Sequence, residues 1–182
     1  MALSATIYKC RLQISDMDRG YYATHDLTIA QHPSENDVRM MARVMAFALH
    51  ADEALQFTRG LSSDDEPDLW MRNLGHEIVL WIELGQPDEK RIRRACGRAH
   101  EVVVYGYHER PSTVWWKQHG DALQRFHNLS VRCFDDGVGE ALAALAQRGM
   151  ELSVLIQDGE AWVSDEERQV RVSWQTYKEA AK

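Results

Sequence analysis

Two nearly continuous apolar runs, Glu77–Leu84 and Glu101–Tyr107, constrain the fold more than any other part of the chain. Strands that are covered on both faces have this composition. Residues 85–88, Gly-Gln-Pro-Asp, break the first run, and a proline followed by acidic residues is typical of the first turn of a helix. The pattern therefore predicts a βαβ unit, in which the two strands are parallel neighbours joined by a right-handed crossover.

The helix between these strands is predicted to bury one narrow stripe and to be basic elsewhere. The stripe consists of Ile92, Ala95, Cys96 and Ala99, and the cations are Lys90, Arg91, Arg93, Arg94 and Arg98. In a helix, positions 90 and 94 share a face, as do 91, 94 and 98. Such a row of cations is either a solvated face, where lysine and arginine usually lie, or a surface that binds an anionic partner.

Upstream, the sequence predicts a β-hairpin and then a helix. Residues 5–14 and 21–29 alternate between apolar and polar side chains on either side of the turn DMDRG. Ser34, with an aspartate three positions later, resembles a capping box and predicts the start of the helix.

Three charged residues of this helix are predicted to play ordinary roles. Arg39 and Arg43 are expected on its solvated edge, since they lie four positions apart outside the apolar stripe. Glu35 is expected in the first turn, where the helix dipole favours an acid. Participation of Glu35 in a metal site is a minor alternative.

Downstream, the pattern continues with helices and strands and ends in β-structure. We expect a helix from Ser112 through Phe126, a strand over 129–134 and a short helix over 140–147 that Gly149 terminates. The last forty or so residues alternate around Asp158-Gly159, a strong hairpin signal, and predict an antiparallel β-meander with a frayed tail, TYKEAAK.

Composition limits the class of protein. The 182 residues suffice for one sizeable core, so we expect a single domain over 1–182. The net charge of −7 argues against extensive non-specific DNA binding. No apolar run is long enough to span a bilayer, and no secretory signal is recognisable. Three scattered cysteines without a CxxC pair predict reduced, buried thiols in a cytoplasmic protein.

Two carboxylates carry the candidate chemistry. The common motifs of nucleotide-cofactor enzymes, zinc proteases and serine hydrolases are absent. Asp68 lies in the segment 67–74 and Glu83 in the segment 77–84, and their side chains reach the same end of the sheet if those segments are neighbours. Two oxygen ligands suit Mg²⁺ or Mn²⁺, which polarises a phosphate oxygen and lowers the pKa of a bound water. Taken alone, surface acids explain most pairs at this spacing.

The sequence resembles two known groups of proteins. Pro67-Asp68 followed by Glu83-Leu84-Gly85 resembles the PD-(D/E)xK nuclease pattern. More closely, the chain is similar to the YaeQ family of bacterial proteins, through ATIYK, HPSE, LQFTRGL, DDEPDLW, LWIELGQPDEKRIRRACGRA, WW, LSV and IQDG. The resemblance implies an α/β, restriction-endonuclease-like mixed sheet flanked by helices, here with an N-terminal β-hairpin and a C-terminal antiparallel β-meander.

The resemblance also assigns roles to individual residues. Asp68 matches the first acid and metal ligand of the pattern, and Glu83 the second. The lysine expected two positions after Glu83 is replaced by Gly85, so Gln86 or Lys90 is expected to take its catalytic place. The two arginines that share a helix face with this region, Arg91 and Arg94, are alternatives for that place and are expected to contact phosphate.

Two classes of function follow. One is a Mg²⁺- or Mn²⁺-dependent phosphodiester hydrolase that acts on nucleic acid through a degenerate site. The other is a non-catalytic binding or adaptor protein that keeps a nuclease-like fold and uses the acidic DDEPDLW segment and the basic helix to bind a protein partner. A small-molecule enzyme using the same acids is a third, weaker option.

Overall fold

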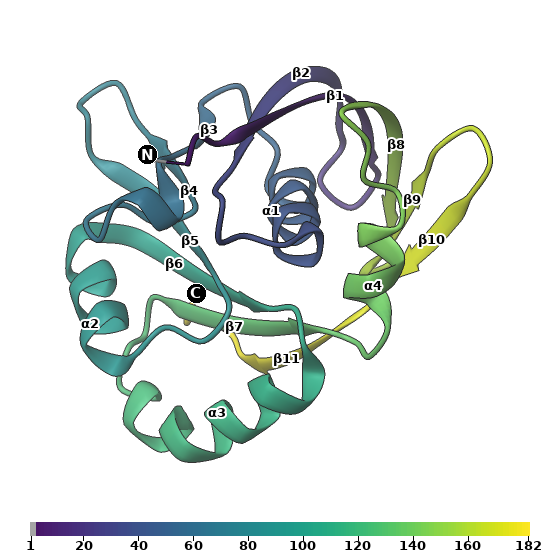
Figure 1. The fold of residues 1–182 in the computed structure, drawn as a ribbon. Helices are drawn as coiled ribbons and strands as arrows, with labels where there is room; N and C mark the ends of the chain where they lie inside the picture. The colour runs from purple at the N-terminus through teal and green to yellow at the C-terminus, as the bar shows by residue number, and fades with distance from the viewer. Residues whose placement is uncertain (1–2) are drawn as a thin grey trace. The chain divides into compact units, whose positions relative to one another are not determined.

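The computed structural model describes residues 3–182, which form two compact units (Figure 1). The first unit comprises the chain up to Ala51 together with Gly137–Ser173, and the second comprises Asp52–Asp136 together with Trp174–Lys182. Each unit has its own sheet and its own helices. The single domain over 1–182 stays a prediction, and residues 1 and 2 lie outside the described part.

The first unit is built on a five-stranded sheet in the order β10-β9-β8-β1-β2. Its strands are β1 (Thr6–Asp16), β2 (Tyr21–Gln31), β8 (Gly149–Gln157), β9 (Glu160–Ser164) and β10 (Gln169–Val172). The predicted N-terminal hairpin is confirmed by the antiparallel pairing of β1 with β2, and the meander by that of β8, β9 and β10. The predicted end of the meander was wrong, because Trp174–Lys178 form a strand of the other sheet. The two pieces join because β1 pairs in parallel with β8, a contact that the sequence did not predict.

The hairpin turn between β8 and β9 shows why its two residues mark a turn. Asp158 and Gly159 have φ angles of 55° and 75°. Two successive left-handed residues define a turn whose twist matches that of the strands, and aspartate and glycine tolerate this conformation well. The predicted two-residue hairpin is therefore confirmed.

Two helices complete the first unit, α1 (Asp37–Leu49) and α4 (Val138–Ala143), which pack against each other. The predicted start of α1 at Ser34 was wrong. Asn36 is the N-cap, and its side chain accepts a hydrogen bond from the Arg39 backbone N–H at 2.9 Å. The expected solvated edge was also wrong in part, since Arg43 is only 5% exposed and binds Glu35.

The second unit is built on a six-stranded mixed sheet in the order β11-β7-β6-β5-β4-β3. Its strands are β3 (Leu55–Phe57), β4 (Leu69–Arg72), β5 (Ile78–Leu84), β6 (Ala99–Gly106), β7 (Leu129–Phe134) and β11 (Trp174–Lys178). Strands β5, β6 and β7 are parallel, which confirms the parallel neighbours predicted for the βαβ unit. The chain is thus a mixed α/β protein with two mixed sheets and flanking helices.

Helices α2 (Glu89–Arg98) and α3 (Glu109–Leu123) pack against each other and against the parallel strands. Their apolar side chains meet those of β5, β6 and β7 in one buried cluster that includes Trp81, Ile92, Val102, Trp115 and Val131. The stripe predicted for α2 is confirmed at Ile92 and Ala95, which are fully buried. This packing fixes α2 beside the end of β5.

Three boundaries in the C-terminal half differ from the predicted ones. Helix α3 begins after His108, so Ser112 lies inside it and does not cap it. Helix α4 begins at Val138 and ends at Ala143, and Gly149 does not terminate it but begins β8. The tail is not frayed at Lys178, whose Nζ donates hydrogen bonds to the carbonyls of Phe126 and Leu129 at 2.7 and 3.0 Å.

The cysteines are free thiols, as predicted. Burial raises the pKa of Cys10 to about 12 and that of Cys96 to about 11, so neither is a thiolate near neutral pH. None of the helices in residues 3–182 has the length and hydrophobicity that a bilayer crossing requires.

Candidate functional site

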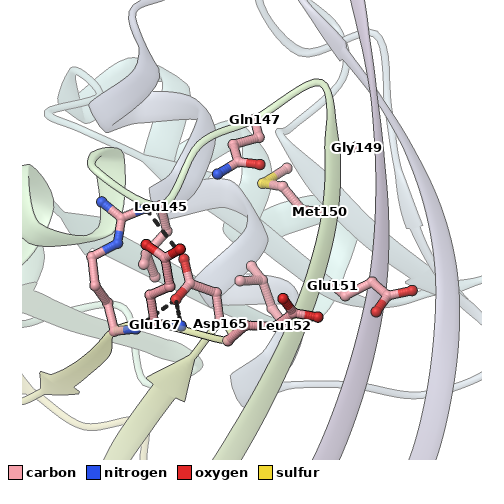
Figure 2. Close-up of a pocket in the computed structure, with 10 residues that line it drawn as sticks. Leu145, Gln147, Gly149, Met150, Glu151, Leu152, Asp165 and Glu167 are labelled. Carbon is pink, nitrogen blue, oxygen red and sulfur yellow. Dashed lines mark hydrogen bonds and ion pairs between the residues drawn. The ribbon is translucent and has the colours of Figure 1, made fainter.

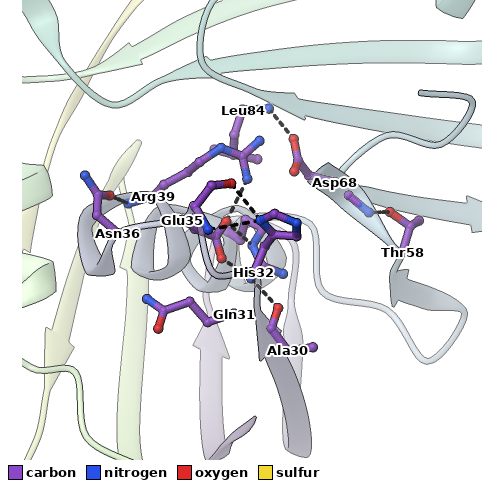
Figure 3. Close-up of polar contacts among 12 residues, drawn as sticks. Ala30, Gln31, His32, Glu35, Asn36, Arg39, Thr58, Asp68 and Leu84 are labelled. Carbon is purple, nitrogen blue, oxygen red and sulfur yellow. Dashed lines mark hydrogen bonds and ion pairs between the residues drawn. The ribbon is translucent and has the colours of Figure 1, made fainter. Parts of the chain in front are cut away.

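Asp68 and Glu83 lie at the same end of two neighbouring strands. Strands β4 and β5 are antiparallel, with Leu69 opposite Ile82, and Asp68 immediately precedes β4. The Asp68 backbone N–H donates to the Ile82 carbonyl at 3.0 Å, and its Oδ2 accepts from the Leu84 backbone N–H at 2.8 Å (Figure 3). The two side chains that the sequence singled out are therefore brought together.

The carboxylate of Glu83 is held by hydrogen bonds to one of its two oxygens. Its Oε1 accepts hydrogen bonds from Trp81 Nε1 at 2.9 Å and from Arg91 Nε at 2.8 Å. Within the described residues, both side-chain hydrogen bonds of Glu83 end on this oxygen. The other oxygen, Oε2, is therefore available to a further ligand.

The two carboxylates influence each other electrostatically. Burial raises the pKa of Glu83, the negative charge of Asp68 raises it further, and the Arg91 charge and the Trp81 and Arg91 hydrogen bonds only partly offset this. Asp68 and Glu83 are 2% and 4% exposed. Two buried acids whose charges act on each other are an arrangement that functional sites often contain.

Arg91 connects Glu83 to a loop that precedes β4. This acidic loop, residues 59–66, carries the acids Asp64, Asp65 and Glu66. Arg91 donates from Nη1 to the Asp64 carbonyl at 3.0 Å and from Nη2 to the Glu66 carbonyl at 2.8 Å. The guanidinium group thus joins a buried carboxylate of β5 to the backbone of the loop.

Two more arginines of α2 hold the same loop. Arg94 Nη2 donates to the Asp64 carbonyl at 2.7 Å, and Arg98 Nη1 donates to the Asp65 carbonyl at 2.9 Å. Arg98 also lies over the Trp81 ring, 5.1 Å from its centroid. The predicted basic row at 91, 94 and 98 is therefore a loop-binding surface rather than a freely solvated helix face.

The other candidates for the lysine role lie apart from the acids. Gln86 and Lys90 are exposed, and within residues 3–182 neither side chain hydrogen-bonds Asp68 or Glu83. Gly85 has a φ of 96°, a conformation that L side chains rarely adopt. The backbone at the place of the pattern's lysine therefore disfavours any side chain, and Arg91 contacts Glu83 instead.

Glu35 belongs to a buried cluster of the first unit (Figure 3). Arg43 contacts both of its oxygens, at 2.5 Å through Nη2 and 3.0 Å through Nε, and Arg39 Nη1 adds a bond at 2.7 Å. The spacing of four and eight residues from Glu35 is the signal that a sequence argument had available. Glu35 as a metal ligand stays a prediction.

The donor set at Asp68 and Glu83 suits a particular kind of cation. In the described part of the chain, no three histidine, cysteine, aspartate or glutamate side chains gather in a way that would hold a metal ion. Two carboxylates without nitrogen or sulfur donors match Mg²⁺ or Mn²⁺, which keep several waters, and not the tetrahedral sites of zinc.

An open hollow of about 370 Å³ lies in the first unit and has a different character (Figure 2). Four acids contribute to its lining, Glu151, Asp165, Glu166 and Glu167. The backbone N–H groups of Glu167 and Arg168 hold the pKa of Asp165 below its usual range. These bonds account for Asp165 as a turn residue, and none of the predicted site residues lines the hollow.

Comparison with known proteins identifies relatives along nearly the whole chain. The family model described as YaeQ protein matches residues 1–174. Two proteins described as "Uncharacterized protein YaeQ", from Salmonella typhi and from Escherichia coli strain K12, are each 47% identical over 178 residues, which cover 96% of this chain and 98% of theirs.

Two crystal structures share the fold. The YaeQ protein from Xanthomonas axonopodis pv. citri is 52% identical, with a TM-score of 0.93 over 98% of this chain and 100% of that one. The YaeQ protein from Pseudomonas syringae is 35% identical, with a TM-score of 0.92 over 96% and 97%.

Proposed function

This chain belongs to the YaeQ family, and we propose for it the activity that its buried acids support best, divalent-metal-dependent hydrolysis of phosphodiester bonds in nucleic acid. The proposal includes a degenerate PD-(D/E)xK site on a restriction-endonuclease-like sheet. The observation that carries it is the buried pair of Asp68 and Glu83, in which the charge of Asp68 acts on Glu83 and Arg91 contacts Glu83.

Asp68 and Glu83 are the residues that would hold the metal. The Leu84 backbone N–H orients the Asp68 carboxylate through Oδ2, and Trp81 orients Glu83 through Oε1, which leaves Oε2 for the ion. A bound Mg²⁺ or Mn²⁺ supplies Lewis-acid polarisation of a phosphate oxygen and a water of lowered pKa.

Arg91 takes the role that lysine has in the pattern. Its guanidinium group contacts Glu83 at 2.8 Å, so it lies where negative charge develops on a phosphate held near that carboxylate. A guanidinium group stabilises such charge through two parallel hydrogen bonds, but it cannot act as a base because it stays protonated. The proposal therefore assigns charge stabilisation to Arg91. Gln86 and Lys90, which are exposed, take a secondary part near the site.

Metal titration and a cleavage assay test this proposal together. Mn²⁺ binding is measured by calorimetry, and cleavage is measured on single- and double-stranded DNA and RNA with Mg²⁺ or Mn²⁺. We expect binding and cleavage in the native protein, both lost in Asp68→Asn and in Glu83→Gln. Glu101→Gln is the matched control, because Glu101 is an exposed acid on the adjacent strand β6.

The outcomes separate the alternatives. Cleavage that survives equally in Asp68→Asn and Glu101→Gln would come from a contaminant and would refute the proposal. Absence of both metal binding and cleavage would favour a second candidate, a non-catalytic binding protein that retains the fold. The positive φ at Gly85 is the observation in favour of this second candidate, since it disfavours a lysine at that position of the pattern.

A further inference from the structure

The acids of the proposed site are closed off by the acidic loop. Gly60 lies so near the Asp68 carboxylate that a Cβ added to it would be 3.3 Å from Oδ1. At its other end, the loop is tied to Glu83 through Arg91, which contacts that carboxylate and two loop carbonyls. Asp68 is 2% and Glu83 4% exposed, so a hydrated cation and a phosphate need an opening, and the loop lies against Asp68 and is tied to Glu83 through Arg91.

The loop is a closed segment with a defined neck. Arg59 donates from its backbone N–H to Glu66 Oε2 at 3.1 Å, and the two side chains form an ion pair at 3.3 Å. The Thr58 hydroxyl donates to the Pro67 carbonyl, and the Thr58 backbone N–H donates to the Asp68 carbonyl at 3.2 Å. Such a neck confines opening to the residues between Arg59 and Glu66, which loosen and lose their internal hydrogen bonds while β4 stays in place.

The bonds that hold the loop are of a kind that an anion can replace. Arg91, Arg94 and Arg98 donate four hydrogen bonds, and all four acceptors are neutral backbone carbonyls. The nearest carboxylate contact of Arg94, with Asp65, is long at 3.8 Å. A phosphate adds a negative charge and accepts two parallel hydrogen bonds from one guanidinium group, which a single backbone carbonyl cannot do, so a phosphodiester is the better partner for these arginines.

The geometry of α2 indicates an extended ligand. Positions 91, 94 and 98 lie on one face of the helix, and a rise of about 1.5 Å per residue spreads the row over roughly 10 Å. Asp64 and Asp65 are exposed beside this row of arginines. Their negative charges therefore lie in the positive potential of the arginines, where a polyanion would otherwise bind. The acidic loop thus covers the cationic face of α2 in the closed structure.

We infer that the acidic loop is a lid, and that a phosphodiester chain opens it by taking Arg91, Arg94 and Arg98 from the loop carbonyls. This inference rests on the proposed function, because it describes how the substrate of that same site gains access. It adds a condition on substrates: a single small phosphate engages too few of the arginines to release the loop, whereas a chain of phosphates engages the row.

Hydrogen exchange of the loop amides, measured without divalent metal, tests the lid separately from catalysis. The reporters are the backbone N–H groups of Arg59, Ser62, Ser63 and Asp65, each of which is hydrogen-bonded in the closed loop. A short single-stranded DNA in EDTA is the probe, and inorganic phosphate is the comparison ligand. We expect DNA to accelerate exchange at these amides, and phosphate at the same charge concentration to leave it unchanged.

Adjacent arginines provide a matched pair of variants. Arg94→Gln removes a bond to the loop, and we expect roughly three- to tenfold faster loop exchange without DNA, in line with the loss of one hydrogen bond. Arg93→Gln removes the same charge from an exposed position of the same helix and should leave loop exchange unchanged. Both variants are expected to fold, since each side chain is exposed, and exchange in β5 verifies this.

Several results would overturn the lid. They are DNA that binds by fluorescence anisotropy yet leaves loop exchange unchanged, DNA that does not bind, and Arg94→Gln behaving like Arg93→Gln. Failure of the proposed function gives a different pattern, in which DNA opens the loop but Mg²⁺ and Mn²⁺ support no cleavage.

Discussion

Two buried glutamate–arginine pairs, one in each unit, have the same sequence spacing and different surroundings. Glu35 pairs with Arg43 and Glu83 pairs with Arg91, eight residues apart in both cases. Both oxygens of Glu35 accept hydrogen bonds from arginines, whereas the side-chain bonds of Glu83 end on one oxygen beside a second carboxylate. A saturated carboxylate stabilises its unit, while a half-satisfied one retains the capacity to bind a ligand.

The largest expected difference between the pairs is in stability. Glu35→Gln leaves the buried Arg43 without its charge partner, so we expect a loss of about 3–5 kcal/mol in the free energy of unfolding. Glu83→Gln should cost less, because Arg91 is 26% exposed and is partly hydrated. Urea denaturation of the two variants measures the difference, and equal losses would contradict the distinction drawn between the pairs.

The next effect concerns the position of the missing lysine. Gly85→Ala forces an L side chain into a φ of 96°, which we expect to cost about 1–3 kcal/mol. Gly97→Ala is the control, since Gly97 lies within α2, where no atom approaches an added Cβ within 4 Å, and alanine favours a helix. Thermal denaturation would show whether Gly85 is kept for its conformation. Equal stability of the two variants would mean that the backbone at Gly85 relaxes freely.

The pH dependence of metal binding should report the raised pKa of Glu83. Protonated Glu83 cannot bind a cation, so Mn²⁺ affinity should fall as the pH decreases through the raised pKa, above the ordinary value of 4.5. Below that point, each pH unit should weaken binding by up to about tenfold, or about 1.4 kcal/mol. Calorimetry across a pH series measures this. A midpoint at or below the ordinary value would show that Asp68 and burial do not act on Glu83 as described.

The raised pKa of Glu83 also makes the folding stability depend on pH. The protonated form of Glu83 is favoured in the folded state, so the folded chain binds more protons than the unfolded chain between the ordinary and the raised pKa. Stability therefore decreases as the pH rises through this window. Glu83→Gln carries no such charge, so the variant should lose this part of the pH dependence.

The smallest expected effect concerns the hydrogen bond from Trp81 to Glu83 Oε1. Trp81→Phe keeps most of the buried ring and removes the indole N–H bond to Oε1, which should cost about 1 kcal/mol in stability. It should also weaken Mn²⁺ binding, because the carboxylate is then less well oriented. Trp70→Phe, which alters the neighbouring tryptophan across the β4–β5 pair, is the control. Unchanged Mn²⁺ affinity in Trp81→Phe would argue against an orienting role for the indole.

Local patterns predicted the second unit better than the first. The apolar runs of β5 and β6, the helix between them and the strand β7 were all predictable, because strand and helix periodicity are properties of a few adjacent residues. The parallel pairing of β1 with β8 was not, since it joins segments such as Leu12 and Leu152 that share no local signal. Asn36 and not Ser34 is the N-cap of α1, because the first residue of a helix is determined by tertiary packing as well as by local sequence.

At the candidate site, the acids were predictable and their partners were not. Pro67-Asp68 and Glu83 followed from a spacing pattern. The role of Arg91 depended on which face of α2 turns towards the loop, and the burial of Arg43 depended on packing around α1. Sequence spacing indicates which side chains share a helix face, but only the tertiary structure determines what that face contacts.

The pairing of β1 with β8 has a consequence for synthesis on the ribosome. The first two strands emerge early, yet the neighbour of β1 is completed only with Gln157. At roughly 5–20 residues per second, the hairpin waits on the order of ten seconds for that strand. During this interval Asp52–Asp136 emerges as a continuous stretch, so most of the second unit is able to fold while the first is still half made. The nascent hairpin, with the apolar face that includes Leu12 and Ile14, is therefore the part of the molecule most exposed to aggregation and to chaperones.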